Sequence, residues 1–201
     1  MSENTLEVTF ESRIDKSTDR DSTRYALGDV LATPAEDGKV FLTATDSRIL
    51  AIVEADGMTE QEQQIPAAVV PKRKTPTCVQ LNGQWDSSDG KFCPVDPNPR
   101  RFPPCAAVLQ SVQADYFATV SLDAKLLQSL SEALGANADE RGVTLFIPQP
   151  DKEGRIDSAI PVLGRLGIGV IMPFSSERAE TDRKRYQDIS DRYLSAREAV
   201  K

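Results

Sequence analysis

Short segments in which apolar and polar residues alternate recur along much of the chain, and turn-forming residues separate them. This two-residue period is typical of β-strands with one buried face. Residues 5–14 open the chain with such a strand, residues 40–55 predict a hairpin with a kink at TDS, and residues 78–85 predict a second hairpin around Asn-Gly. The sequence therefore predicts a fold rich in antiparallel strands.

Two segments carry helical periodicity instead. Residues 121–135 place their leucines on one face, with Ser121 or Asp123 as the cap and Gly135 just past the end. Residues 175–201 hold charged residues on one side and an apolar series at gaps of three and four on the other, which predicts an amphipathic helical tail. That series is Tyr186, Ile189, Tyr193, Ala196 and Val200.

The remaining segments predict loops and short strands. The polar run at 15–24 has too few apolar residues to anchor a helix, so we expect a loop or a frayed turn. Five prolines fall within residues 86–104, which excludes a central strand or a helix interior and predicts an irregular segment. Strands are expected at residues 142–148, 158–164 and 167–174.

Charge and residue types limit the classes of function. The net charge is −7, which argues against a surface that coats nucleic acid or an anionic membrane. The chain has no histidine, so catalysis and metal binding that need imidazole are excluded. Three widely spaced cysteines without a C-x-x-C pair indicate reduced thiols, and there is no signal-peptide pattern or membrane-spanning apolar run. We expect a cytoplasmic protein that does not associate with membranes.

Carboxylates are the remaining candidates for catalysis. Aspartate-rich stretches at 15–21 and 86–90 match no calcium-loop spacing, so we interpret them as solvated turns and expect no metal and no cofactor. Asp46 and Glu54 are the candidates for an alternative function, a small metal-dependent hydrolase. A strand kink that carries an aspartate is more often a turn in which the side chain binds its own backbone.

Three separated segments together resemble the bacterial sliding clamp family, the beta subunit of DNA polymerase III. RYALGDVL at 24–31 with VFLTATDSRILAIV at 40–53 is similar to a strand and a strand-turn-strand of that family. RRFPPCAAVLQ at 100–110 is similar to an interdomain hinge. VSLDAKLLQSLSEALG at 120–135, running through to GVIMPF at 169–174, is similar to a helix and the C-terminal segment.

The resemblance implies a reduced and divergent clamp. Its fold is an α+β, sliding-clamp-like arrangement of antiparallel sheets with few helices, to which the C-terminal amphipathic helix is added. Residues 1–112 form a clamp-like unit of two half-repeats, residues 113–174 a third half-unit, and residues 175–201 a helical tail. Helices that line the DNA channel in the family are replaced here by the polar run at 15–24 and by a proline-interrupted segment near 66–76.

In that family a hydrophobic groove binds short linear peptides of DNA replication and repair proteins, and the resemblance implies the same site here. Ser47 stands where the family usually has Gly, Arg48 where it usually has His, and Ile49 where it usually has Arg. Aliphatic and Met side chains suit an adaptable apolar pocket, although strand residues of this kind also build ordinary cores. The implied groove residues are Leu27, Thr45, Ser47, Arg48, Ile49, Leu50, Leu109, Val170, Met172, Pro173 and Phe174.

The sequence thus predicts a non-catalytic protein that acts as a small processivity factor or as a competitor of the full clamp. Contact with DNA is expected only if several copies assemble into a ring. The tail either covers the groove or pairs with a second copy, and a structural oligomerising protein is a further alternative. The basic residues that offer weak candidates for phosphate contact are Lys72, Arg73, Lys74, Arg100 and Arg101.

Overall fold

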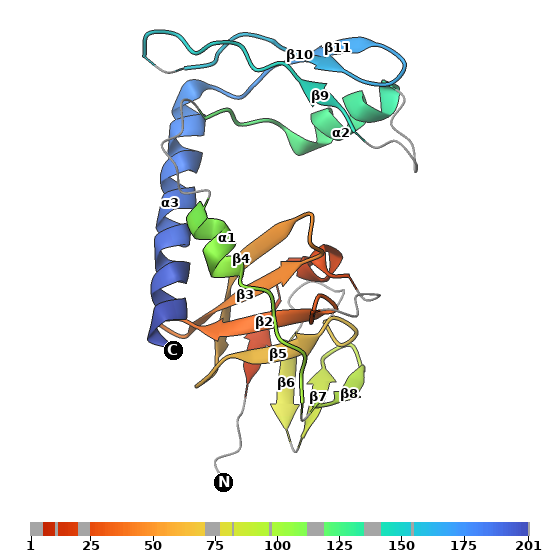
Figure 1. Ribbon diagram of the computed structural model, residues 1–201, viewed down its shortest axis with the longest axis vertical. Coiled ribbons are helices and arrows are strands. Elements are labelled where there is room, and N and C mark those ends of the chain that lie inside the picture. Colours follow the sequence, from red (N-terminus) through yellow and green to blue (C-terminus); the bar gives the residue numbers. More distant parts are fainter. Residues whose placement is uncertain are drawn as a thin grey trace. The chain divides into compact units, whose positions relative to one another are not determined.

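The computed structural model describes residues 6–10, 12–19, 25–70, 77–81, 83–96, 98–111, 119–134, 142–153 and 155–200. The chain divides into two compact units (Figure 1). Unit 1 comprises Met1–Gln113 with Ile189–Lys201, and unit 2 comprises Ala114–Asp188. The predicted α+β class with antiparallel sheets and a C-terminal helix is confirmed.

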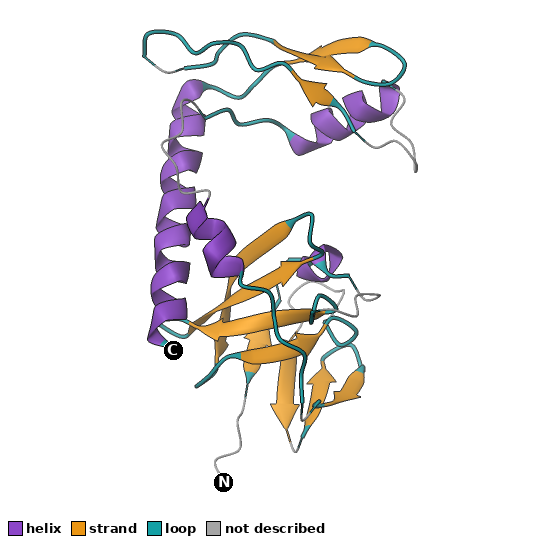
Figure 2. Ribbon diagram, viewed as in Figure 1, coloured by secondary structure: helices purple, strands orange, loops and turns teal. Residues whose placement is uncertain are grey.

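Unit 1 contains an eight-stranded antiparallel sheet in the order β5-β2-β3-β4-β1-β6-β7-β8, and Figure 2 shows that this sheet is curled. Both predicted hairpins are confirmed, because β3 pairs with β4 and β6 pairs with β7. The strands are β1 (Glu7–Thr9), β2 (Asp29–Pro34), β3 (Lys39–Thr45), β4 (Leu50–Met58), β5 (Gln63–Pro66), β6 (Thr77–Leu81), β7 (Gln84–Ser87) and β8 (Phe92–Pro94).

Alternation along the strands builds the core of unit 1. In β3, Val40 and Leu42 point into a cluster that also contains Trp85, while Phe41 points to the opposite face. The curl brings strands from both ends of the sheet around this cluster. Burial of large apolar side chains is the main stabilising term of such a unit, at roughly 1.5–3 kcal/mol for each fully buried side chain.

Two predicted irregular segments of unit 1 contain regular structure. A short 3-10 helix at Ile14–Ser17 occupies the start of the predicted loop at 15–24, where Ile14 and Asp15 are buried. The proline-rich segment contains β8, which ends the described sheet. Proline is compatible with an edge strand because no ladder hydrogen bond is needed on its free side. The predicted hinge at 100–110 contains the helix α1 (Cys105–Ser111), which begins after two prolines.

Unit 2 contains a three-stranded antiparallel sheet in the order β11-β10-β9, and the three predicted strands are confirmed. They are β9 (Thr144–Leu145), β10 (Ile160–Leu163) and β11 (Ile168–Ile171). The predicted helix is α2 (Ala124–Ala133), and the Asp123 Oδ1 atom caps it by accepting from the backbone N–H of Lys125 at 2.8 Å. Gly135, the predicted end signal, lies outside the described residues.

The predicted tail helix is α3 (Ser176–Ala199), and the boundary between the two units falls within it. In unit 1, Tyr193 of α3 is buried against Phe41 of β3 and Leu109 of α1. The two rings meet edge to face, with centroids 5.6 Å apart. Among the described residues, none of the helices combines the length and the apolar character needed to cross a lipid bilayer.

Candidate functional site

The outer face of the unit 2 sheet carries exposed apolar side chains. Along β11 and just after it, Ile168, Val170 and Met172 are 82%, 64% and 60% exposed, whereas the alternate residue Ile171 is only 4% exposed. The two-residue period of a strand sends these side chains to opposite faces. One face of β11 is therefore part of the core, and the other is open.

The inner face is covered by α2. Leu127, Leu130 and Leu134 pack against the buried side chains of β10 and β11. The approach is close at Gly164, where an added Cβ would lie 2.8 Å from the backbone oxygen of Leu134. Gly164 therefore lets the end of α2 pack tightly against the β10–β11 turn.

The exposed apolar surface extends beyond β11. The strand register places Val170 opposite Pro161 and Ile168 opposite Leu163. Phe146 donates its backbone N–H to the oxygen of Pro161 at 3.0 Å, which places it beside the same face. Among the described strands, β11 ends the sheet. We call this surface the outer-face stripe; it comprises Phe146, Pro161, Leu163, Ile168, Val170 and Met172.

Two of the predicted groove residues, Val170 and Met172, belong to the outer-face stripe. Pro173 and Phe174 follow in the chain and are half-buried. The backbone N–H of Phe174 donates to the oxygen of Ser121 at 2.8 Å, and the guanidinium of Arg178 lies over the Phe174 ring at 4.0 Å. The segment after β11 is thus held by contacts within unit 2.

The predicted groove residues of unit 1 gather mainly in the β3–β4 turn. The Asp46 Oδ1 atom accepts from the backbone N–H groups of Ile49 and Arg48, each at 2.8 Å. These hydrogen bonds lower the pKa of Asp46. Thr45 donates its hydroxyl to the Ile49 oxygen at 2.6 Å, and Ser47 adopts a left-handed φ of 78°. The aspartate kink is therefore the predicted turn in which a side chain binds its own backbone.

The other groove residues of unit 1 differ in exposure. Arg48 and Ile49 are exposed at the turn, and Leu50 is half-buried at the start of β4. Leu27 and Leu109 are buried, and Leu109 contacts the cluster of Phe41 and Tyr193. Unit 1 thus presents the β3–β4 turn at its surface and keeps these two leucines in its interior.

The candidate hydrolase carboxylates have structural partners. Asp46 is engaged by the turn, and Glu54 forms an ion pair with Arg192 of α3 at 2.6 Å. Within the described ranges there is no group of three or more Cys, Asp or Glu side chains placed to hold a metal ion. Burial raises the pKa of the Cys78 thiol to about 12 and that of Cys105 to about 11. A buried thiol of this kind is a poor nucleophile.

The predicted basic residues fall into two groups. Arg100 and Arg101 are exposed, and Arg101 lines a cavity of about 590 Å³ together with Glu62, Arg197 and Glu198. Two arginines face two glutamates in this lining, which therefore carries no excess positive charge to attract a phosphate. Lys72, Arg73 and Lys74 lie outside the described residues.

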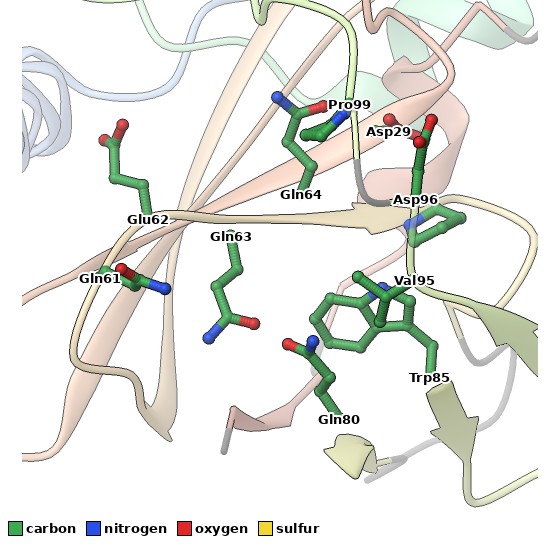
Figure 3. Close-up of a pocket in the computed structure, with 11 residues that line it drawn as sticks. Asp29, Gln61, Glu62, Gln63, Gln64, Gln80, Trp85, Val95, Asp96 and Pro99 are labelled. Atoms are coloured by element: carbon green, nitrogen blue, oxygen red, sulfur yellow. The ribbon is translucent and has the colours of Figure 1, made fainter. Parts of the chain in front are cut away.

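A second cavity, of about 230 Å³, lies in unit 1 between β5 and the β6–β7 hairpin (Figure 3). Sequence reasoning missed it, because no local pattern connects Gln63 and Gln64, which begin β5, with the β6–β7 hairpin. Three glutamines are among the residues that line this cavity, and the side-chain oxygen of each is buried without a hydrogen-bond partner among the described residues. These residues are Gln63, Gln64 and Gln80. Leaving a buried acceptor unpaired costs ~1–3 kcal/mol.

Comparison with protein-family models and with curated proteins found no match for the chain. The two surfaces described above, the outer-face stripe and the glutamine-lined cavity, are therefore assessed on their own geometry.

Proposed function

We propose that the protein is a non-catalytic, sliding-clamp-like binding protein that takes up short apolar segments of DNA replication or repair proteins on the outer-face stripe of unit 2. The observation that carries the proposal is the exposure of Ile168, Val170 and Met172 along one side of β11. Contiguous apolar surface that is open to solvent marks interaction sites on soluble proteins.

The geometry of β11 suits an extended peptide. As the last described strand of its sheet, β11 offers its backbone N–H and C=O groups to an added strand. Side chains of the peptide would then lie against Val170 and Met172, whose flexible thioether adapts to different partners. Burial of a Val or Met side chain contributes roughly 1.5–3 kcal/mol, which offsets part of the loss of translational and rotational freedom on binding.

The β3–β4 turn of unit 1 supports the clamp-like part of the proposal. Ser47 has a φ of 78°, in the left-handed region that favours glycine. Glycine is the residue that the resembling family usually has at this position. The backbone at Ser47 thus has a conformation that a glycine at this position would favour.

The test is calorimetric titration of the full chain with a short clamp-binding peptide. Val170→Ser and Met172→Ser each remove an apolar contact, and we expect each to weaken binding about tenfold, the effect of a typical central contact. Leu126→Ser is the matched control, because Leu126 is 58% exposed but lies on α2. Equal loss of affinity in all three variants, or no loss in the first two, would contradict the proposal.

A second candidate function is assembly of copies of the chain through the same edge. The side of β11 that pairs with no described strand suits pairing with a second β11 as well as with a peptide. The tail helix is a weaker candidate for this role, because Tyr193 is buried within unit 1. Light scattering on the wild type and on Met172→Ser separates the two functions, since only assembly predicts a mass that falls with the substitution.

A further inference from the structure

The glutamine-lined cavity of unit 1 has no role in the function proposed above. It lies where β5, the last described strand at one end of the sheet, faces the β6–β7 hairpin and the segment that follows β8. Figure 3 shows the side chains of Gln63 and Gln80 extending toward one another beside Trp85 and Val95. The cavity thus combines an apolar wall with two converging amide groups.

Gln63 presents an acceptor rather than a donor to this space. Gln63 is only 9% exposed, and its Nε2 atom donates to the hydroxyl of Thr59 at 3.3 Å. Its Oε1 atom is buried and has no hydrogen-bond partner among the described residues, and the same holds for Oε1 of Gln80. Because Gln63 and Gln80 both line the cavity and converge there, their two buried, unpaired oxygens indicate that a hydrogen-bond donor belongs between them.

The charges around the cavity favour a cationic donor. Asp29, Glu62 and Asp96 line it as well. Burial raises the pKa of Asp29, the charge of Asp96 raises it further, and Arg100 opposes the shift. Glu62 is already paired with Arg197 and accepts from Thr33, and Asp96 accepts from the backbone N–H of Asn98. Among the described residues the lining thus holds three carboxylates and no basic side chain, and Arg100 and Arg197 oppose only part of this negative charge.

We propose that this cavity binds a guanidinium group, which donates hydrogen bonds to the side-chain oxygens of Gln63 and Gln80. Guanidinium is planar, carries five N–H donors and is weakly hydrated, so it can serve several acceptors in a half-apolar space. A divalent metal ion fits less well, because the described residues offer no group of three or more metal-binding side chains. The guanidinium belongs either to an arginine side chain of a partner protein or to a small free compound.

The test is calorimetric titration of the full chain with n-butylguanidinium. Gln63→Leu and Gln80→Leu each remove one acceptor, and we expect each to weaken binding about tenfold, as for loss of a hydrogen bond to a charged group. Gln84→Leu is the matched control on β7, where Gln84 donates to Asp86 outside the cavity, and it should bind like the wild type. Thermal unfolding of each variant confirms that the fold is retained.

Titration with a second cation distinguishes the contribution of hydrogen bonds to the affinity from that of charge. n-Butyltrimethylammonium carries the same charge without N–H donors, and we expect it to bind at least about tenfold more weakly than n-butylguanidinium. Absence of n-butylguanidinium binding to the wild type would overturn the proposal and mean that the two glutamines satisfy each other. Equal binding of the two cations, or an equal loss in Gln84→Leu, would overturn it as well.

The source of the guanidinium is identified by a third titration, with N-acetyl-arginine amide. Binding as tight as that of n-butylguanidinium supports an arginine side chain presented by a partner protein. Binding of n-butylguanidinium alone supports a small free compound. Because the cavity lies in unit 1 and the outer-face stripe in unit 2, failure of one proposal does not affect the other.

Discussion

Unit 1 covers both faces of its central strands, whereas unit 2 covers only one face of its sheet. In β3 of unit 1, Leu42 is buried in the main core and Phe41 is buried on the other face under Tyr193. In β11 of unit 2, Ile171 is buried while Ile168 is almost fully exposed. The same alternating pattern is therefore used for stability in unit 1 and leaves a surface for binding in unit 2.

Among the substitutions that test this difference between the units, Trp85→Ala is expected to lower the free energy of unfolding the most. Trp85 is buried in the core of unit 1, and its truncation leaves a large cavity. We expect the free energy of unfolding to fall by about 3–5 kcal/mol, measured by urea denaturation. Ile168→Ala in unit 2 should change it by no more than ~0.5 kcal/mol. Similar losses for both substitutions would show that Ile168 is covered.

The substitution Tyr193→Ala tests how much α3 stabilises unit 1 by packing on Phe41 of β3. This change removes a buried ring that packs edge to face on Phe41, so we expect a loss of about 3 kcal/mol in the free energy of unfolding. Tyr186→Ala is the control, because Tyr186 is on the same helix and is exposed. A loss for Tyr186→Ala as large as that for Tyr193→Ala would contradict the claim that α3 packs on β3 through Tyr193 while Tyr186 stays exposed.

A smaller effect is expected at the β3–β4 turn of unit 1. Ser47→Gly removes the cost of a left-handed backbone for a residue with a Cβ atom and should raise the free energy of unfolding by ~1 kcal/mol. Ser47→Ala retains the Cβ atom and should give no gain. Thermal unfolding of both variants and of the wild type measures these differences in stability.

The smallest change in the free energy of unfolding is expected at Asp46, and it depends on pH. Hydrogen bonds from the Ile49 and Arg48 backbone hold the pKa of Asp46 below its usual value, so the carboxylate stabilises the fold above its unfolded pKa of ~3.9. That contribution is lost as the pH falls through the lower folded value. The stability difference between wild type and Asp46→Ala should therefore shrink in acid. A difference that is the same at neutral pH and at pH about 2, well below the ordinary range, would contradict this role.

The elements of the fold were largely predictable from local patterns. Alternation and turn residues identified the β3–β4 hairpin and the strands of unit 2, and Asp123 marked the start of α2. The edge strand β8 and the helix α1 were missed because prolines dominate that part of the sequence. Short elements of this kind depend on packing more than on their own residues.

The sites were less predictable, because a pattern identifies the two faces of a strand without showing which face is covered. Val170 and Met172 were predicted as groove residues, and their exposure on one face became visible only with the structure. The burial of Leu109 depends on Tyr193, which is distant in the sequence. The cavity joins Gln63 of β5 to Gln80 of β6, and no local signal connects those residues.

The most direct test of the account is backbone NMR of the isotope-labelled full chain during titration with a short clamp-binding peptide. We predict that the amide signals of residues 160–172 shift with increasing peptide, while those of the β3 strand do not. The affinity from these shifts should match the calorimetric value. A saturating titration that leaves residues 160–172 unchanged would contradict the claim that the open face of unit 2 is the binding surface.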